Sequence, residues 1–338
     1  MQTLEDLDRL MVRPSPALID MMKELDGDIM LLGVGGKMGP SLAKLALKAI
    51  ELAGVQKQVY GVSRFSEAGL KEELESCGVK TIACDLLDDA ALDALPDVKN
   101  IIYAAGTKFG TTGREYFTWA MNAYLPGRVA QKFRNSRIVA FSTGNVYPLT
   151  PVKHGGASES MTPGPIGEYA ASCLGRERIF EHFSHKNGTP VLIYRLNYAI
   201  DLRYGVLLEL AKSVQAGKPI DVSMGHFNCI WQGDANDIAL RALAHTSSPP
   251  NLLNVTGPET VSVRYAATEL GRRLGKEPVF EGVESDTALL SNASKVMQLM
   301  GYPSVSLLQM IDWTAQWLAS GGKLIDKPTH FQEREGKF

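Results

Sequence analysis

A glycine-rich turn between an apolar run and a long helical pattern constrains this chain more than any other feature. Residues 28–32 predict a buried strand, because they are few, mostly apolar and preceded by Asp-Gly. Apolar side chains then recur at helical spacing from Pro40 to Ala53. Four glycines stand between these patterns, at positions 33, 35, 36 and 39. The sequence therefore predicts a strand-to-helix turn built from glycines.

Three of these glycines have distinct roles in such a turn. Gly33 permits the tight turn, Gly36 lets a pyrophosphate approach the backbone, and Gly39 allows the helix to pack closely on the strand. The free N–H groups and the positive end of the helix dipole then face the phosphates. We therefore expect a dinucleotide site here, although a glycine-rich turn without a ligand is the alternative. The expected phosphate loop consists of Gly33, Gly35, Gly36, Lys37, Met38 and Gly39.

Composition narrows the class of protein further. The 338 residues suffice for one large domain or two intimate ones, and the formal net charge is -2. No block of like charge stands out, so we expect a small-molecule substrate and no nucleic-acid or membrane partner. Four scattered cysteines favour reduced thiols and a cytoplasmic location, and the histidines lack metal-ligand spacing. The acidic N-terminus is unlike a signal peptide, and no apolar run reaches the length of a membrane span.

Strand and helix patterns alternate after the glycine-rich turn, which predicts βαβ units and a parallel sheet covered on both faces. With right-handed crossovers, this gives a Rossmann-type doubly wound α/β fold. The expected strands lie near 28–33, 58–63, 79–83, 98–104, 137–142 and 190–195. The expected helices include 39–53, 115–134, 168–186, 261–274 and 304–319.

The same pattern predicts how the chain is divided. Residues 1–27 form an N-terminal extension with a short helix after Pro16. Residues 28–200 form the nucleotide-binding domain, to which the chain returns near 226–257. Residues 201–330 mainly form a smaller substrate-binding lobe. The polar tail from Lys327 to Phe338 is expected to be poorly ordered.

The ends of the expected strands carry the residues that would select a cofactor. An acidic residue at the end of the second strand binds the ribose 2′-OH of NAD, whereas an arginine accommodates the 2′-phosphate of NADP. Ser63 occupies the acidic position here and Arg64 follows it, which favours NADP over NAD. Asp85, at the end of the third strand, could reach the adenine amino group. The small residues Ala104, Ala105 and Gly106 end the fourth strand and leave room beside the nicotinamide ribose.

Together, these segments resemble the extended short-chain dehydrogenase/reductases, the group that includes nucleotide-sugar epimerases and dehydratases. The resemblance spans roughly residues 28–300. It is carried by Gly33–Gly39, Asp85-Leu86, Tyr103-Ala104-Ala105-Gly106, Phe141–Tyr147, Tyr169 with its helix, Arg195-Leu196-Asn197-Tyr198 and Asn254–Gly257.

The resemblance implies a catalytic pair and exposes one departure. It assigns the reacting hydroxyl side chain to Thr143, with Ser142 as its neighbour, and the general acid or base to Tyr169. In such enzymes a lysine one helical turn later holds the nicotinamide ribose and lowers the tyrosine pKa. This chain has Cys173 at that position. Since an unperturbed tyrosine titrates near pH 10, only about one phenol in a thousand would be ionised at pH 7.

Three interpretations of Cys173 stay open. Another cation, such as Lys108 or Arg176, substitutes for the lysine. Alternatively, Tyr169 acts only as a proton donor, or another residue is the base. In the third interpretation the protein binds its cofactor with little turnover.

The resemblance also implies a pocket and an assembly. Residues expected to contact the substrate are Lys108, Ser142, Asn145, Asn197 and Tyr198. The expected activity is NAD(P)-dependent oxidoreduction, epimerisation or dehydration of a hydroxylated, sugar-derived small molecule. The alternative is a cofactor-binding sensor or scaffold protein. Such proteins commonly form homodimers through the helices near 115–134 and 168–186.

Overall fold

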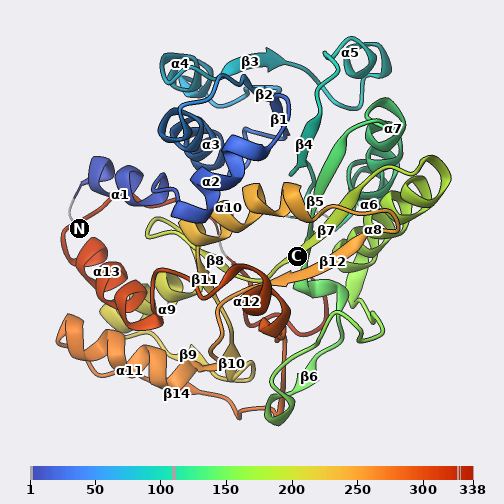
Figure 1. Ribbon diagram of the computed structural model, residues 1–338. Coiled ribbons are helices and arrows are strands. Elements are labelled where there is room, and N and C mark those ends of the chain that lie inside the picture. Colours follow the sequence, from blue (N-terminus) through green and yellow to red (C-terminus); the bar gives the residue numbers. More distant parts are fainter. Residues whose placement is uncertain (1–2, 109–111, 326, 328, 338) are drawn as a thin grey trace.

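The computed structural model describes residues 3–108, 112–325, 327 and 329–337. Its centre is a sheet of seven parallel strands in the order β12-β7-β5-β4-β1-β2-β3 (Figure 1). This arrangement confirms the Rossmann-type fold. The strands are β1 (Ile29–Leu32), β2 (Val59–Ser63), β3 (Lys80–Ala83), β4 (Asn100–Tyr103), β5 (Arg137–Thr143), β7 (Val191–Leu196) and β12 (Asn251–Val255).

Side chains that alternate along each strand supply two separate cores, as the pleat requires. Ile29 and Leu31 of β1 pack on one face, whereas Met30 and Leu32 pack on the other. The first face is covered by α2 (Pro16–Glu24), α3 (Gly39–Ala53), α10 (Gln232–Arg241) and α12 (Ser294–Met300). The second face is covered by α5 (Asp89–Asp93), α7 (Leu125–Lys132) and α8 (Gly167–Asn187). A short helix, α4 (Leu70–Ser76), follows β2.

The helix expected over 115–134 is interrupted. It consists of α6 (Glu115–Trp119), the π-helical turn η1 (Ala120–Tyr124) and α7. The amide of Leu125 donates to the carbonyl of Ala120, five residues earlier. Pro126 follows and has no amide hydrogen for the α-helical ladder. Turns of this kind are frequent at functional sites.

The N-terminal extension contains two capped helices, of which the sequence predicted one. Thr3 caps α1 (Leu4–Met11) and Ser15 caps α2. Leu7 and Met11 of α1 enter the core of the smaller lobe, whereas α2 packs against α3 and α10. The extension therefore touches both parts of the molecule.

The smaller lobe is mainly helical. Its core joins α9 (Val206–Ala216), α11 (Val263–Leu274) and α13 (Leu307–Ala319). Short two-stranded pairs surround these helices: β8 (Ala199–Ile200) with β11 (Ile230–Trp231), β9 (Ile220–Asp221) with β14 (Phe280–Glu281), and β10 (His226–Phe227) with β13 (Val261–Ser262). A further pair, β6 (Thr150–Pro151) with β15 (Thr287–Ala288), links the two parts of the chain.

The expectation of a poorly ordered C-terminal tail is wrong for the described residues. Phe331 is only 1% exposed, and its ring lies edge-on to Phe227. The Arg334 guanidinium donates to the carbonyl of Thr287 at 2.9 Å. Gly336 lies against the backbone of Gly167 at the start of α8. A single buried aromatic residue and one arginine therefore anchor a segment whose composition looks like a solvated tail.

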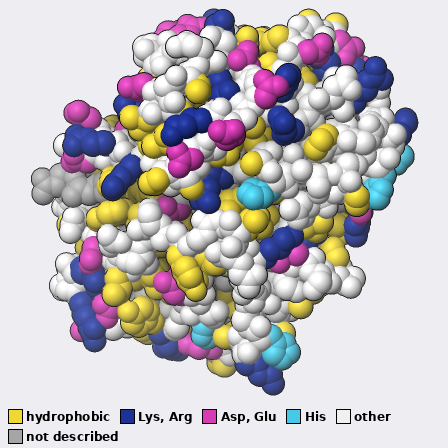
Figure 2. All heavy atoms as spheres, in the orientation of Figure 1, with side chains coloured by type: hydrophobic (Ala, Val, Ile, Leu, Met, Phe, Trp, Pro, Cys, Tyr) yellow, Lys and Arg dark blue, Asp and Glu magenta, His cyan; other side chains and the backbone are white. Residues whose placement is uncertain are grey.

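The surface mixes charges of both signs. Basic and acidic side chains are interspersed over the face shown in Figure 2. Within the described part of the chain, no helix combines the length and apolar character needed to cross a bilayer.

Candidate active site

The glycine-rich loop follows β1, and each glycine there meets a different constraint. Gly33 has a φ of +95°, and a Cβ on it would lie 2.7 Å from the amide nitrogen of Ala105. A Cβ on Gly39 would lie 2.2 Å from the carbonyl oxygen of Val34, so the start of α3 touches the preceding turn. Gly36 differs, since its Cβ would meet only the carbonyl oxygen of Gly33, at 3.3 Å. The loop is therefore closely packed at both ends and accessible in the middle.

A cavity of about 300 Å³ lies at the carboxyl ends of the sheet strands, beside this loop. Such edges are where ligands bind in open α/β sheets. Gly33, Gly36, Lys37, Met38 and Gly39 line one side. Among the other residues expected in the site, it is lined by Ala104, Lys108, Ser142, Thr143, Asn145 and Tyr169. Asn197 and Tyr198 line it as well.

Other residues expected near the cofactor lie outside the cavity wall. Ser63 lies beside the loop, because a Cβ on Gly35 would be 2.5 Å from its hydroxyl oxygen. Arg64 follows it at the end of β2 and is exposed. Asp85 is exposed too, and its carboxylate accepts a hydrogen bond from the amide of Leu87 at 3.1 Å. Leu86 and Ala105 belong to the core under β4.

The expected catalytic pair is in contact. Tyr169, in the first turn of α8, shares side-chain hydrogen bonds with Thr143 and with Cys173. Thr143 ends β5, and its hydroxyl also donates to Asn145 at 2.9 Å. Burial raises the pKa of Tyr169, and the Cys173 thiol raises it further, against the opposing effects of Arg176 and Thr143. The phenol is therefore protonated at neutral pH, so it can donate a proton.

Two cations flank this pair. Arg176, one turn beyond Cys173, donates to the carbonyl of Phe141 at 2.8 Å, and its charge lowers the pKa of Tyr169. The amine of Lys108 lies 5.9 Å from the centre of the Tyr169 ring. Burial lowers the pKa of Lys108 to about 8. Both cations considered from the sequence therefore lie at the site, whereas Cys173 is fully buried behind Tyr169.

Asn122, in the π-helical turn, holds the loop that carries Lys108. Its side-chain amide donates to the carbonyl of Thr107 and its oxygen accepts from the amide of Thr107, each at 2.9 Å. The same oxygen accepts from Arg176 at 2.7 Å. Arg176 also explains why position 106 is a glycine, because a Cβ there would lie 2.4 Å from the guanidinium. The interrupted helix thus fixes the end of β4 relative to α8.

A buried network of hydrogen bonds and one ion pair connects the elements that carry the site. Glu177 of α8 pairs with Arg195 of β7 at 2.6 Å, and both side chains are almost fully buried. Arg195 also donates to the hydroxyl of Tyr147 at 2.6 Å. Ser142 donates its hydroxyl to Glu177. The Ser142 side chain is thus used within the protein, and the network ties β5, α8 and β7 together.

The turn after β7 closes the cavity on the side of the smaller lobe. The Asn197 side chain donates to Asn228 at 2.8 Å, and Tyr198 has a φ of +43°. Sequence reasoning missed five residues of this wall, which are Ala199, Tyr204, Gly205, Val206 and Thr329. Tyr204 follows a turn without a recognisable motif, and Thr329 lies in the tail. The one sign in the sequence that the tail packs against the protein is the isolated aromatic residue Phe331.

Comparison with known proteins identifies the family of this chain. The model of the NAD dependent epimerase/dehydratase family matches residues 29–247, so the chain belongs to that family. This confirms the resemblance seen in the sequence. No curated protein matches the chain by sequence.

Solved structures share the fold at low sequence identity. UDP-glucuronic acid 4-epimerase from Bacillus cereus, in complex with UDP-glucuronic acid and NAD, is 18% identical with a TM-score of 0.68, covering 86% of this chain and 99% of its own. UDP-N-acetylglucosamine 4-epimerase from Methanobrevibacter ruminantium is 16% identical with a TM-score of 0.71, covering 88% and 99%. UDP-glucose 4-epimerase from Thermus thermophilus, in complex with NAD, is 19% identical with a TM-score of 0.67, covering 85% and 97%.

Proposed function

We propose that the protein binds a nicotinamide dinucleotide in this cavity and acts on a hydroxylated, sugar-derived small molecule. The reaction would be an oxidoreduction, or an epimerisation or dehydration that proceeds through one. The observation that carries the proposal is that the glycine-rich loop and the Thr143–Tyr169 pair face the same cavity. The residues present fit the cofactor, because the accessible backbone at Gly36 leaves room for a pyrophosphate.

The nicotinamide, when bound, supplies hydride exchange with the substrate carbon. Tyr169 then donates its proton to the substrate oxygen when a carbonyl is reduced, consistent with a pKa that keeps it protonated. Thr143 orients the phenol through their hydrogen bond. In the reverse direction Tyr169 must accept the hydroxyl proton, and nearby positive charge favours this. Arg176 and Lys108 together take the place of the lysine that Cys173 replaces.

For the cofactor we propose a preference for NADP(H) over NAD(H). The support is local: Ser63 provides no carboxylate for a ribose 2′-OH, and the exposed Arg64 guanidinium can pair with a 2′-phosphate. Two of the solved structures above are complexes with NAD. NAD therefore stays the alternative cofactor for this chain.

We also propose a homodimer in the cytoplasm, formed through the helices near 115–134 and 168–186, which are α6, η1, α7 and α8. Tyr116 is 74% exposed and Tyr124 is 55% exposed, and Trp119 lies between them in the chain. Exposed aromatic side chains are enriched at protein interfaces. Light scattering at micromolar concentration tests the dimer, and a monomer would contradict it.

One observation favours a second candidate function. Cys173 provides no positive charge beside Tyr169, and its own pKa is raised by burial. A cofactor-binding sensor or scaffold protein with little turnover would tolerate this arrangement.

A substrate screen separates the two candidate functions. Wild-type protein and Tyr169→Phe, each loaded with the oxidised or the reduced form of NADP or NAD, are mixed with sugar-derived alcohols, aldehydes and ketones. Absorbance at the nicotinamide band is followed, and the sugar products are separated by chromatography. An oxidoreductase changes the redox state of the cofactor, whereas an epimerase or dehydratase converts the sugar with no net change in the cofactor, and either activity should fall at least about a hundredfold in Tyr169→Phe. Cofactor binding with neither cofactor turnover nor sugar conversion across the screen favours the sensor, and turnover unchanged in Tyr169→Phe rejects Tyr169 as the proton donor.

A further inference from the structure

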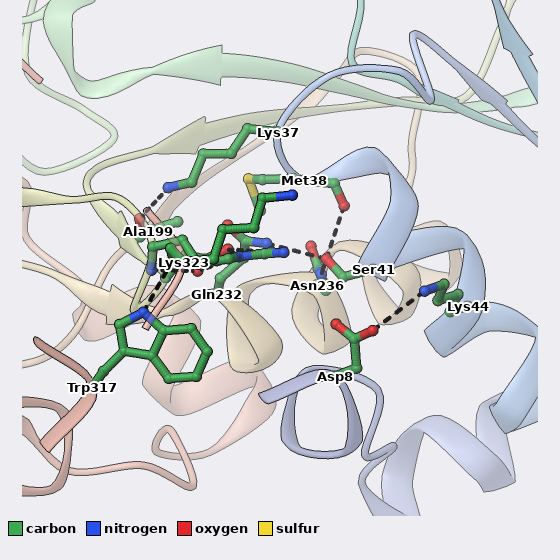
Figure 3. Close-up of polar contacts among 12 residues, drawn as sticks. Asp8, Lys37, Met38, Ser41, Lys44, Ala199, Gln232, Asn236, Trp317 and Lys323 are labelled. Carbon is green, nitrogen blue, oxygen red and sulfur yellow. Dashed lines mark hydrogen bonds and ion pairs between the residues drawn. The ribbon is translucent and has the colours of Figure 1, made fainter. Parts of the chain in front are cut away.

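Lys37 stands apart from the other residues of the glycine-rich loop, because its side chain leaves the loop. Its amine donates to the carbonyl of Ala199 at 2.9 Å and lies 4.1 Å from the centre of the Tyr204 ring. Figure 3 shows the side chain extending from the start of α3 toward Ala199. The amine thus lies next to the turn after β7, which belongs to the wall formed with the smaller lobe.

The surroundings of this amine are short of negative charge. The carboxylate of Asp201 attracts it, but Arg203 already pairs with that carboxylate at 2.7 Å. Lys108 and Arg203 repel it. Among the residues that the structure describes, no carboxylate forms an ion pair with Lys37, whose contacts are the carbonyl and the ring. Desolvation by the surrounding protein lowers the pKa of Lys37 to about 7.

The same side chain can be reached from the cavity. Part of Lys37 is exposed and the residue lines the cavity together with Lys108, although protein surrounds its amine. An anion placed between these amines would relieve their mutual repulsion and favour the charged form of Lys37. Arriving in a site surrounded by protein, it would form charge-assisted hydrogen bonds that are stronger than neutral ones.

We propose that Lys37, together with Lys108, binds an anionic group of the substrate, a carboxylate or a phosphate. This inference rests on the proposed function, and it names the substrate class as hydroxylated acids or phosphorylated sugars. The rival explanation is that Lys37 pairs with the phosphates of the cofactor. The contacts with Ala199 and Tyr204 favour the substrate, because they hold the amine at β8 and at the turn before α9, in the wall next to the smaller lobe.

Three matched probes test the proposal. D-glucuronate, glucose 6-phosphate and D-glucose differ in the charge carried at one end of the same sugar. Their binding is measured by calorimetry on full-length protein saturated with NADPH or NADH. Lys37→Met removes the charge and keeps much of the side-chain volume. Lys48→Met, on the exposed side of α3, is the matched control.

We expect wild-type protein and Lys48→Met to bind one anionic probe at least about tenfold more tightly than glucose, and Lys37→Met to lose that preference. The stronger of the two anionic probes assigns the group as carboxylate or phosphate. No preference in wild-type protein overturns the inference. So does a Lys37→Met protein that keeps the preference but binds the cofactor at least about tenfold more weakly. Failure of wild-type protein to bind either cofactor instead rejects the proposed function itself.

Discussion

Two alanine substitutions in the glycine-rich loop should have opposite consequences. Gly39→Ala would place a methyl group 2.2 Å from the carbonyl oxygen of Val34. Neither group can rotate away, because the backbone fixes the positions of the Cβ atom and of the carbonyl oxygen. Gly36→Ala would meet one carbonyl oxygen at 3.3 Å and otherwise point into free space. The first variant should therefore lose stability, and the second should lose cofactor binding.

The magnitudes follow from these clearances. Overpacking of a close contact costs about 1–3 kcal/mol, so Gly39→Ala should lower the melting temperature by roughly 2–8 °C. In Gly36→Ala a small steric cost is offset by about 0.4–1 kcal/mol from the reduced freedom of the unfolded chain, so its stability should barely change. Its methyl group would keep a pyrophosphate from the loop amides. Losing one hydrogen bond to a charged group costs about 1.5–3 kcal/mol, or roughly a 10- to 150-fold weaker affinity.

The assay combines thermal unfolding with fluorescence titration of NADPH and NADH. Wild-type protein, Gly36→Ala and Gly39→Ala are compared in the same buffer. A Gly36→Ala protein that is folded and binds both cofactors as tightly as wild-type protein would refute the phosphate site. A Gly39→Ala protein as stable as wild-type protein would refute the packing argument alone.

Three further predictions concern the supporting network, the cofactor and the missing lysine. Removing one partner of the buried pair, in Glu177→Gln or Arg195→Met, should lower the free energy of unfolding by about 3–5 kcal/mol in denaturant titrations, because it leaves a buried group unpaired; a loss below about 1 kcal/mol would contradict this. Arg64→Ala should weaken NADPH by about tenfold and leave NADH nearly unchanged, and an unaltered ratio of the two affinities would remove Arg64 from the site. Cys173→Lys should move the rate–pH profile for substrate oxidation toward lower pH, because a cation beside Tyr169 lowers a pKa that burial now raises; a profile that stays in place would contradict this.

Local constraints explain why the sheet could be predicted from sequence. Six strands were expected within two or three residues of their observed ends, since each is a short apolar run followed by a turn or a helix. β12 was anticipated only through its turn at Asn254–Gly257. The tight turn at Gly33 and the close packing at Gly39 also depend on neighbours in the sequence. Whether the expected residues bind the cofactor is still a prediction.

Long-range contacts explain what the sequence did not reveal. The π-helical turn inside 115–134 depends on where Asn122 meets Thr107 and Arg176, which no local pattern records. The tail packs because Phe331 finds a pocket beside Phe227, far away in the chain. Hydrophobic periodicity cannot predict a contact that depends on one isolated aromatic residue.

A crystal structure of the protein with NADPH tests the central claim most directly. We expect the pyrophosphate against the backbone of residues 36–39 and the nicotinamide ring beside Thr143 and Tyr169, with the adenosine 2′-phosphate near Arg64. A cofactor bound elsewhere, or one whose nicotinamide lies away from Tyr169, would contradict it.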